Sequence, residues 1–222
     1  MVDIRKRRNC INRFWINIRE QGLIFYVPFL FNYLLIPMIV FDTYKKFGLD
    51  DQTRMTVVKF SQYFTPVLVS WWIFFALIKY IDGEGNEIFY VQNRMKAKEV
   101  IVFYIVYIVS IMIPFLFYRM MFSGMELEWL RIAIESWIFA ALTYFFSFFC
   151  KNIAVAMIPV VGYAFASVFL RGMQTSIFLY YEGYRVTPEM LLGKYMILLG
   201  IAFFLFLAGM FLNYKMERYT SE

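Results

Sequence analysis

Six long apolar stretches fill more than half of this 222-residue chain, and each is about long enough to cross a lipid bilayer. Aromatic residues make up 22% of the chain and charged residues 17%, and the mean hydropathy is +0.61. A soluble domain of this size could not keep so much apolar surface in water. The sequence therefore predicts an all-α, polytopic membrane protein. The six spans are expected over residues 22–41, 56–78, 100–118, 132–150, 153–170 and 191–212.

Lysine and arginine are distributed unevenly between the connecting segments. With the N-terminus inside, the cytoplasmic segments carry thirteen of them and the outer segments seven. This bias predicts that both termini lie in the cytoplasm. The plasma membrane is the expected location. The expected parts are a cytoplasmic interfacial helix (1–21), a six-helix transmembrane domain (22–212) and a cytoplasmic tail (213–222).

The N-terminal segment mixes apolar residues at helical spacing with arginine and asparagine. That pattern is typical of an amphipathic helix in the headgroup region. A disordered basic tail is the alternative.

Several chemistries are excluded by composition. The chain contains no histidine, which removes the usual ligand or base of intramembrane metalloproteases, haem bundles and Ser–His hydrolases. It also has no GxxxxGK[ST] loop for ATP. Cys10 and Cys150 both fall on the predicted cytoplasmic side, where thiols stay reduced, and ordinary packing is favoured over a reactive thiol. We expect no enzymatic activity, and no catalytic, metal-binding or cofactor-binding residue or nucleic-acid partner.

The connection between the second and third spans, residues 79–99, is the largest predicted cytoplasmic element. Its start, residues 82–86, is rich in glycine, aspartate and asparagine and predicts a turn. Residues 87–93 then predict a short helix that presents aromatic and apolar side chains, followed by basic residues at the headgroup level. Such a helix suggests a docking site for another protein. The alternative, a solvated loop with basic anchors, explains the lysines but not the aromatic residues.

With this loop, the chain resembles the permease subunits of type-2 ABC exporters. Those proteins have six spans, cytoplasmic termini, an interfacial helix before the first span, a coupling helix between spans two and three, and an outer-leaflet element before span six. The outer element would match residues 173–186, within the 171–190 connection. The proline usual after the coupling helix and the glycine usual before the final lysine are missing here. The residues that match the ATPase-coupling loop are Glu84, Gly85, Glu87, Ile88, Phe89, Tyr90, Val91 and Arg94.

The resemblance implies a function and partners. It implies the permease of an ATP-driven exporter, which moves an amphipathic peptide, lipid or drug-like substrate by alternating access. ATP and Mg²⁺ would bind a separate ATPase chain, and a second permease chain would complete a homo- or heterodimer within membrane lipid. Two other classes stay open. One is a six-span substrate-binding component of a vitamin-type importer, and the other is a non-transport membrane immunity or assembly protein.

Three ionisable residues lie inside the predicted spans, each near the outer end: Lys59, Glu135 and Lys194. The two lysines could each extend individually to the interface. Alternatively, Glu135 pairs with Lys194 or Lys59 in an outer polar layer that closes the exit.

Two further features concern packing. The fourth and fifth spans are joined only by Lys151 and Asn152, which predicts a tight antiparallel hairpin. Aromatic runs at 71–75 and 144–149 could line a path for an amphipathic substrate, or could serve as lipid-facing and helix-packing bulk.

Overall fold

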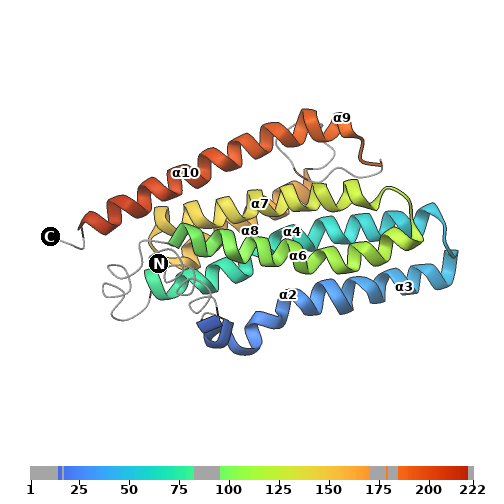
Figure 1. Ribbon diagram of the computed structural model, residues 1–222, viewed down its shortest axis with the longest axis horizontal. Coiled ribbons are helices and arrows are strands. Elements are labelled where there is room, and N and C mark those ends of the chain that lie inside the picture. The colour runs from blue at the N-terminus through green and yellow to red at the C-terminus, as the bar shows by residue number, and fades with distance from the viewer. Residues whose placement is uncertain (1–14, 17, 83–95, 171–178, 180–184, 220–222) are drawn as a thin grey trace, which may run out of the picture.

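The computed structural model describes residues 15–16, 18–82, 96–170, 179 and 185–219 (Figure 1). Within these residues all regular structure is helical and no strand occurs. Most of the predicted interfacial helix (1–21) and most of the 171–190 connection lie outside the described residues, as does the whole set Glu84, Gly85, Glu87, Ile88, Phe89, Tyr90, Val91 and Arg94. The α-helices are α2 (Val27–Leu30), α3 (Ile36–Phe47), α4 (Asp51–Ile81), α6 (Lys96–Met121), α7 (Met125–Cys150), α8 (Ile153–Phe169), α9 (Pro188–Met190) and α10 (Met196–Tyr219).

Five described helical segments are long and apolar enough to cross a membrane. They are Ile18–Phe47, Asp51–Ile81, Lys96–Met121, Met125–Cys150 and Pro188–Met216. The prediction of an all-helical fold with several helices of membrane-spanning length is confirmed for the described residues. The fifth predicted span corresponds to α8, an apolar helix of 17 residues.

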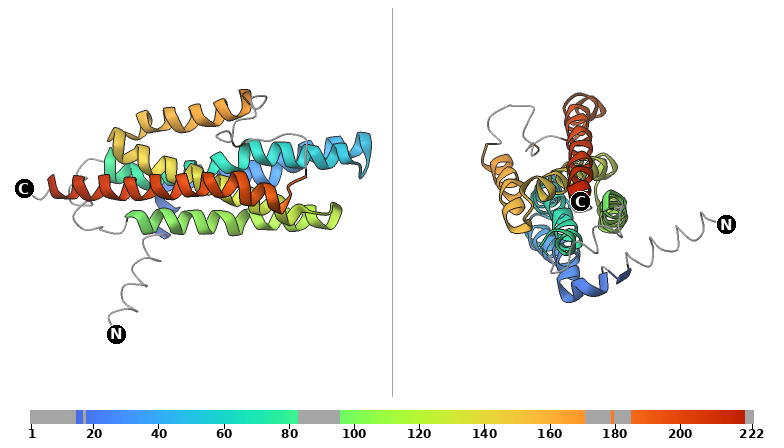
Figure 2. Two further views of the ribbon diagram at one scale, coloured as in Figure 1. Left: turned by 90° about the horizontal axis from the view of Figure 1, so that it is seen from above. Right: turned by 90° about the vertical axis from the view of Figure 1, so that its left-hand side faces the viewer.

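Helices α4 and α7 form the centre of the bundle. Helix α7 packs against α4, α6, α8 and α10, and α4 also packs against α3. In the end-on view of Figure 2 the other helices surround this pair. The core between them is aromatic. Trp72 is fully buried, and its ring stacks on Phe25 with centroids 4.6 Å apart.

The first membrane-length segment is an interrupted helix. A 3₁₀ helix, η1 (Gly22–Tyr26), precedes α2, and a π-helix, η2 (Phe31–Leu35), separates α2 from α3. A buried asparagine holds this irregular backbone. Asn32 Nδ2 donates to the Pro28 carbonyl (2.8 Å), and Thr65 Oγ1 of α4 donates to Asn32 Oδ1 (2.7 Å). Such side-chain bonds allow irregular helices inside an apolar bundle.

The predicted tight hairpin between α7 and α8 is confirmed. Helix α7 ends at Cys150 and α8 begins at Ile153, and Lys151 turns the chain with a left-handed φ of 52°. Asn152 Oδ1 caps α8 by accepting from Val155 N (3.0 Å). Asp82 Oδ2 accepts from Ile153 N (3.0 Å), so the end of α4 is bound to the start of α8.

Candidate functional site

Charged side chains meet inside the bundle where α4 and α7 begin. Arg54 lies on the first turn of α4, and Glu128 and Arg131 lie three residues apart on α7, so they share one helix face. The side chains of Arg54, Glu128 and Arg131 are only 7%, 1% and 0% exposed. We call these three residues, with Gln62, the ionic cluster.

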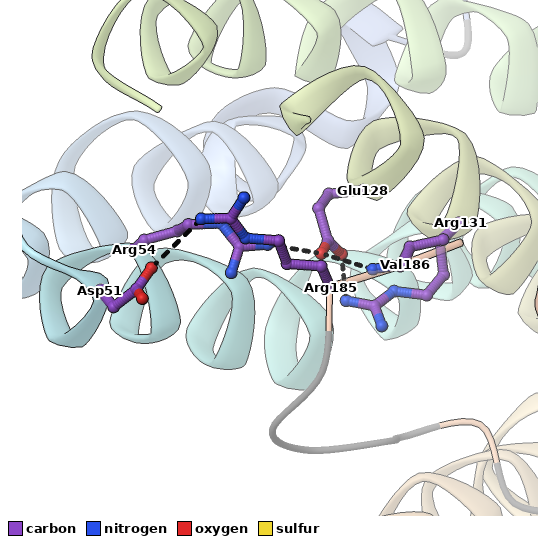
Figure 3. Close-up of polar contacts among 6 residues, drawn as sticks. All are labelled: Asp51, Arg54, Glu128, Arg131, Arg185 and Val186. Carbon is purple, nitrogen blue, oxygen red and sulfur yellow. Dashed lines mark hydrogen bonds and ion pairs between the residues drawn. The ribbon is translucent and has the colours of Figure 1, made fainter. Parts of the chain in front are cut away.

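Glu128 is the shared acceptor of the ionic cluster (Figure 3). Its Oε1 lies 3.5 Å from Arg54 Nη2, and its Oε2 forms an ion pair with Arg131 Nη2. The backbone N–H of Val186 also donates to Glu128 Oε1, at 3.5 Å. One carboxylate therefore connects α4, α7 and the segment that leads to α9.

Gln62 completes the surroundings of Arg131. With its amide oxygen facing the guanidinium, Gln62 accepts from Arg131 Nε at 2.6 Å and from Nη1 at 2.7 Å. This contact is a second link between α4 and α7. Burying two guanidinium groups costs free energy unless close, hydrogen-bonded partners compensate, and Glu128 and Gln62 supply those partners.

An exposed ion pair lies beside the ionic cluster. Arg185 Nη2 lies 3.4 Å from Asp51 Oδ1, and both side chains are mostly exposed (Figure 3). Surface pairs of this kind stabilise by at most about 1 kcal/mol. The segment that leads to α9 is therefore held to α4 and α7 mainly by the buried contacts of Glu128 and only weakly by the Arg185–Asp51 pair.

Glu135 extends the polar face of α7 by one turn beyond Arg131. It is fully buried, and its Oε1 lies 3.0 Å from the hydroxyl of Tyr195. The same hydroxyl lies 3.0 Å from the carbonyl oxygen of Leu179. Tyr195 thus connects Glu135 to the polypeptide between α8 and α9.

The two predicted lysines lie in different surroundings. Lys194 is half-buried in the π-helix η3 (Leu191–Tyr195), with Nζ 5.8 Å from the centroid of the Tyr195 ring. Lys59 is exposed on α4, with Nζ 5.9 Å from the Tyr63 ring. The structure therefore brings Glu135 and the residue next to Lys194 together. Pairing of Glu135 with either lysine stays a prediction.

The ionic cluster itself was not predicted from the sequence. Arg54, Glu128 and Arg131 lie in segments that hydropathy assigns to outer connections, where charges would be solvated. The structure begins α4 at Asp51 and α7 at Met125, which places these residues inside helices. One signal was present in the sequence, because Glu128, Arg131 and Glu135 are spaced three and four residues apart, as on one face of a helix.

The described ends of the predicted coupling loop are fixed to the bundle. Lys96 Nζ donates to Asn213 Oδ1 of α10 (3.2 Å), and the Tyr80 hydroxyl of α4 lies 2.9 Å from Glu99 Oε2 of α6. Lys96 is fully buried, although the sequence placed it at the headgroup level. These contacts join the end of α4, the start of α6 and the end of α10 (Figure 1).

No protein-family model, curated protein or solved structure matches this chain. The resemblance to type-2 permeases therefore rests on the arrangement of the sequence alone. Within the described ranges, no group of three or more Cys, Asp or Glu side chains is placed to hold a metal ion.

Proposed function

We propose that the chain is the six-span permease subunit of an ATP-driven exporter, with both termini in the cytoplasm. A separate ATPase chain would bind the 79–99 loop, and a second permease chain would complete the transporter. An amphipathic peptide, lipid or drug-like molecule is the expected substrate. The apolar helical bundle supports a role in transport for this chain, and the lack of an ATP-binding loop in the sequence supports ATP hydrolysis on a separate chain.

The ionic cluster is the observation that carries the proposal. Buried charges within an apolar helical bundle are costly and mark functional positions. Here they connect the two central helices and the segment at Val186 at one end of the bundle. A contact of this kind can hold that end closed in one state and be broken in another, as alternating access requires. In the proposed topology this is the outer end.

The opposite end supports coupling to a partner. The residues at the two described ends of the 79–99 loop join three helices, through Tyr80–Glu99 and Lys96–Asn213. A force applied to the loop would therefore pass to α4, α6 and α10 together. This arrangement suits a subunit that receives mechanical work from a docked ATPase.

The test is association with an ATPase. The full chain is purified in mild detergent together with any ABC ATPase that is encoded beside it, and both association and ATP-dependent transport in vesicles are measured. The Phe89→Ala/Tyr90→Ala double variant should weaken association by a factor of about 30, since loss of an aromatic interface anchor costs about 2 kcal/mol or more. Phe47→Ala is the matched control, because Phe47 is an exposed aromatic residue at the opposite end of the bundle.

Two results would reject the proposal. One is that no ATPase copurifies with the wild-type chain. The other is that the double variant retains both association and transport.

A six-span ligand-binding component of an importer is the second candidate. The interior holds hydrogen-bonded polar side chains that such a binding site requires. Thr143 Oγ1 donates to Ser70 Oγ (2.7 Å), and Thr65 to Asn32 (2.7 Å). This function predicts that one member of a panel of vitamins raises the melting temperature of the purified chain.

A further inference from the structure

An apolar groove of about 410 Å³ lies along the contact between α4 and α8. One wall comes from α4, with Tyr63, Val67 and Phe74, and the other from α8, with Met157 and Ala164. Almost no polar surface lines it. An opening of this kind on the side of a membrane bundle faces hydrocarbon rather than water, so its occupant has to be apolar along the length of the groove.

A cation lies at one end of the groove. Lys59 precedes Tyr63 by one turn, so both lie on the same face of α4. Lys59 is exposed, and its Nζ lies 5.9 Å from the centroid of the Tyr63 ring that lines the groove. The face therefore begins with a positive charge and continues as apolar surface through Val67 to Phe74.

The length of the groove matches one leaflet of a bilayer. From Tyr63 to Phe74 the helix rises about 16 Å. The hydrocarbon core is about 30 Å thick, so each leaflet contributes about 15 Å of acyl chain. Lys59 lies about 6 Å further along the axis, towards the nearer end of α4 and the headgroups.

We propose that the groove binds one acyl chain of an anionic phospholipid whose headgroup phosphate lies at Lys59. A second copy of this chain is the less suitable occupant. A two-fold axis along the membrane normal would place both Lys59 ammonium groups at the same depth across that interface, where like charges repel. The lipid site does not depend on the proposed transport function.

Trp71 provides a direct probe, because it also lines the groove. The full chain is reconstituted in phosphatidylcholine vesicles that contain a minor, fixed share of a lipid with brominated acyl chains. That lipid is either phosphatidylglycerol or phosphatidylcholine. Bromine quenches nearby tryptophan fluorescence, and the Trp71→Phe variant gives the background from the other tryptophans. Trp71 should prefer the brominated anionic lipid by about fivefold, the effect of one lysine near a membrane surface.

Two variants separate the parts of the site. Lys59→Gln should abolish the preference for the anionic lipid but keep quenching by both lipids. Ala164→Phe, which fills the groove, should reduce Trp71 quenching by both. Lys45→Gln is the matched control, because Lys45 is also an exposed lysine over an aromatic ring, Phe41, but lies on α3 away from the groove. It should retain the wild-type preference.

Three results would overturn the site. Equal quenching of wild-type Trp71 by both lipids would remove the role of Lys59, as would an unchanged preference in Lys59→Gln. No quenching by either lipid would mean that protein covers the groove.

Discussion

The two central helices are more buried but less apolar than the outer ones, whereas in soluble proteins the buried helices are the more apolar ones. In the most apolar stretch of α4 and of α7, 67% of the residues are buried within the chain. In the other three membrane-length segments the buried share is 28–33%. Yet α4 and α7 have the lowest mean hydropathy of the five. The most apolar helices thus lie outside, where lipid is the solvent, and the less apolar pair lies inside.

This difference shows what holds the centre together. Association of helices in lipid gains little from burying apolar surface, and depends on close packing and on hydrogen bonds between helices. Hydrogen bonds join the central pair, and a close approach joins α7 to the outer helix α10. Arg131 is bonded to Gln62, Thr143 is bonded to Ser70, and α10 approaches α7 through a glycine at position 209.

The largest expected effect is at the ionic cluster. Arg131→Met keeps most of the volume but leaves Glu128 and Gln62 without their main partner, and removing one member of a buried pair costs about 3–5 kcal/mol. The measurement is reversible unfolding in mixed micelles. Arg119→Met is the control, since the Arg119–Glu126 pair is exposed and contributes at most about 1 kcal/mol.

A double variant sharpens this prediction. Adding Glu128→Gln to Arg131→Met also leaves the buried guanidinium of Arg54 without its carboxylate partner, so the loss of stability should exceed that of Arg131→Met alone. Equal losses in the Arg131 and Arg119 variants would show that the central pair does not depend on its charges.

A smaller effect is expected where α10 approaches α7. A Cβ atom at Gly209 would lie 2.7 Å from Tyr144 Cδ1 and 3.2 Å from Phe145 Cα. Gly209→Ala should therefore destabilise the fold by about 1–3 kcal/mol through overpacking. Gly200→Ala, on the same helix with open space around it, should not destabilise it. The measurement is the melting temperature of each variant in one detergent. Identical values would contradict the close approach of α10 to α7 at Gly209.

The smallest effect is expected for a neutral hydrogen bond between the central helices. Thr143→Val removes the bond to Ser70, and such bonds between membrane helices average about 0.6 kcal/mol. Thr56→Val is the control, because Thr56 donates to Gln52 O of its own helix. A loss for Thr143→Val no greater than for Thr56→Val would mean that this bond adds nothing between helices.

Much of the fold was predictable because lipid imposes a simple rule on sequence. Runs of about 20 apolar residues indicated the five long membrane segments, and the two residues between 150 and 153 left no geometry except a tight hairpin. The helix ends were not predictable in the same way. Hydropathy marks only the uninterrupted apolar run of a helix, whereas α7 begins about two turns before that run, at Met125, and those turns include Glu128 and Arg131.

The candidate site was harder to predict for the same reason. Glu135 was identified from its position inside an apolar run, but its hydrogen bond to Tyr195 depends on tertiary packing that no local pattern encodes. Arg54 and Glu128 were assigned to connecting segments because they lie outside the apolar runs. Their burial depends on the neighbouring ends of α4 and α7, which lie more than 70 residues apart in the sequence.

The length of α8 has a consequence for the surrounding bilayer. In the proposed six-span topology α8 crosses the membrane, but its 17 residues rise about 26 Å, short of the roughly 30 Å hydrocarbon core, and its first residue is fixed to Asp82 of α4. A short helix that is held at one end cannot shift along the membrane normal. The difference between its length and the thickness of the hydrocarbon core therefore cannot be divided between the two membrane surfaces. Hydrophobic mismatch then acts at its far end, near Phe169, where we expect the leaflet to thin by a few ångströms. The protein would accordingly favour thin bilayers over thick, sterol-rich ones.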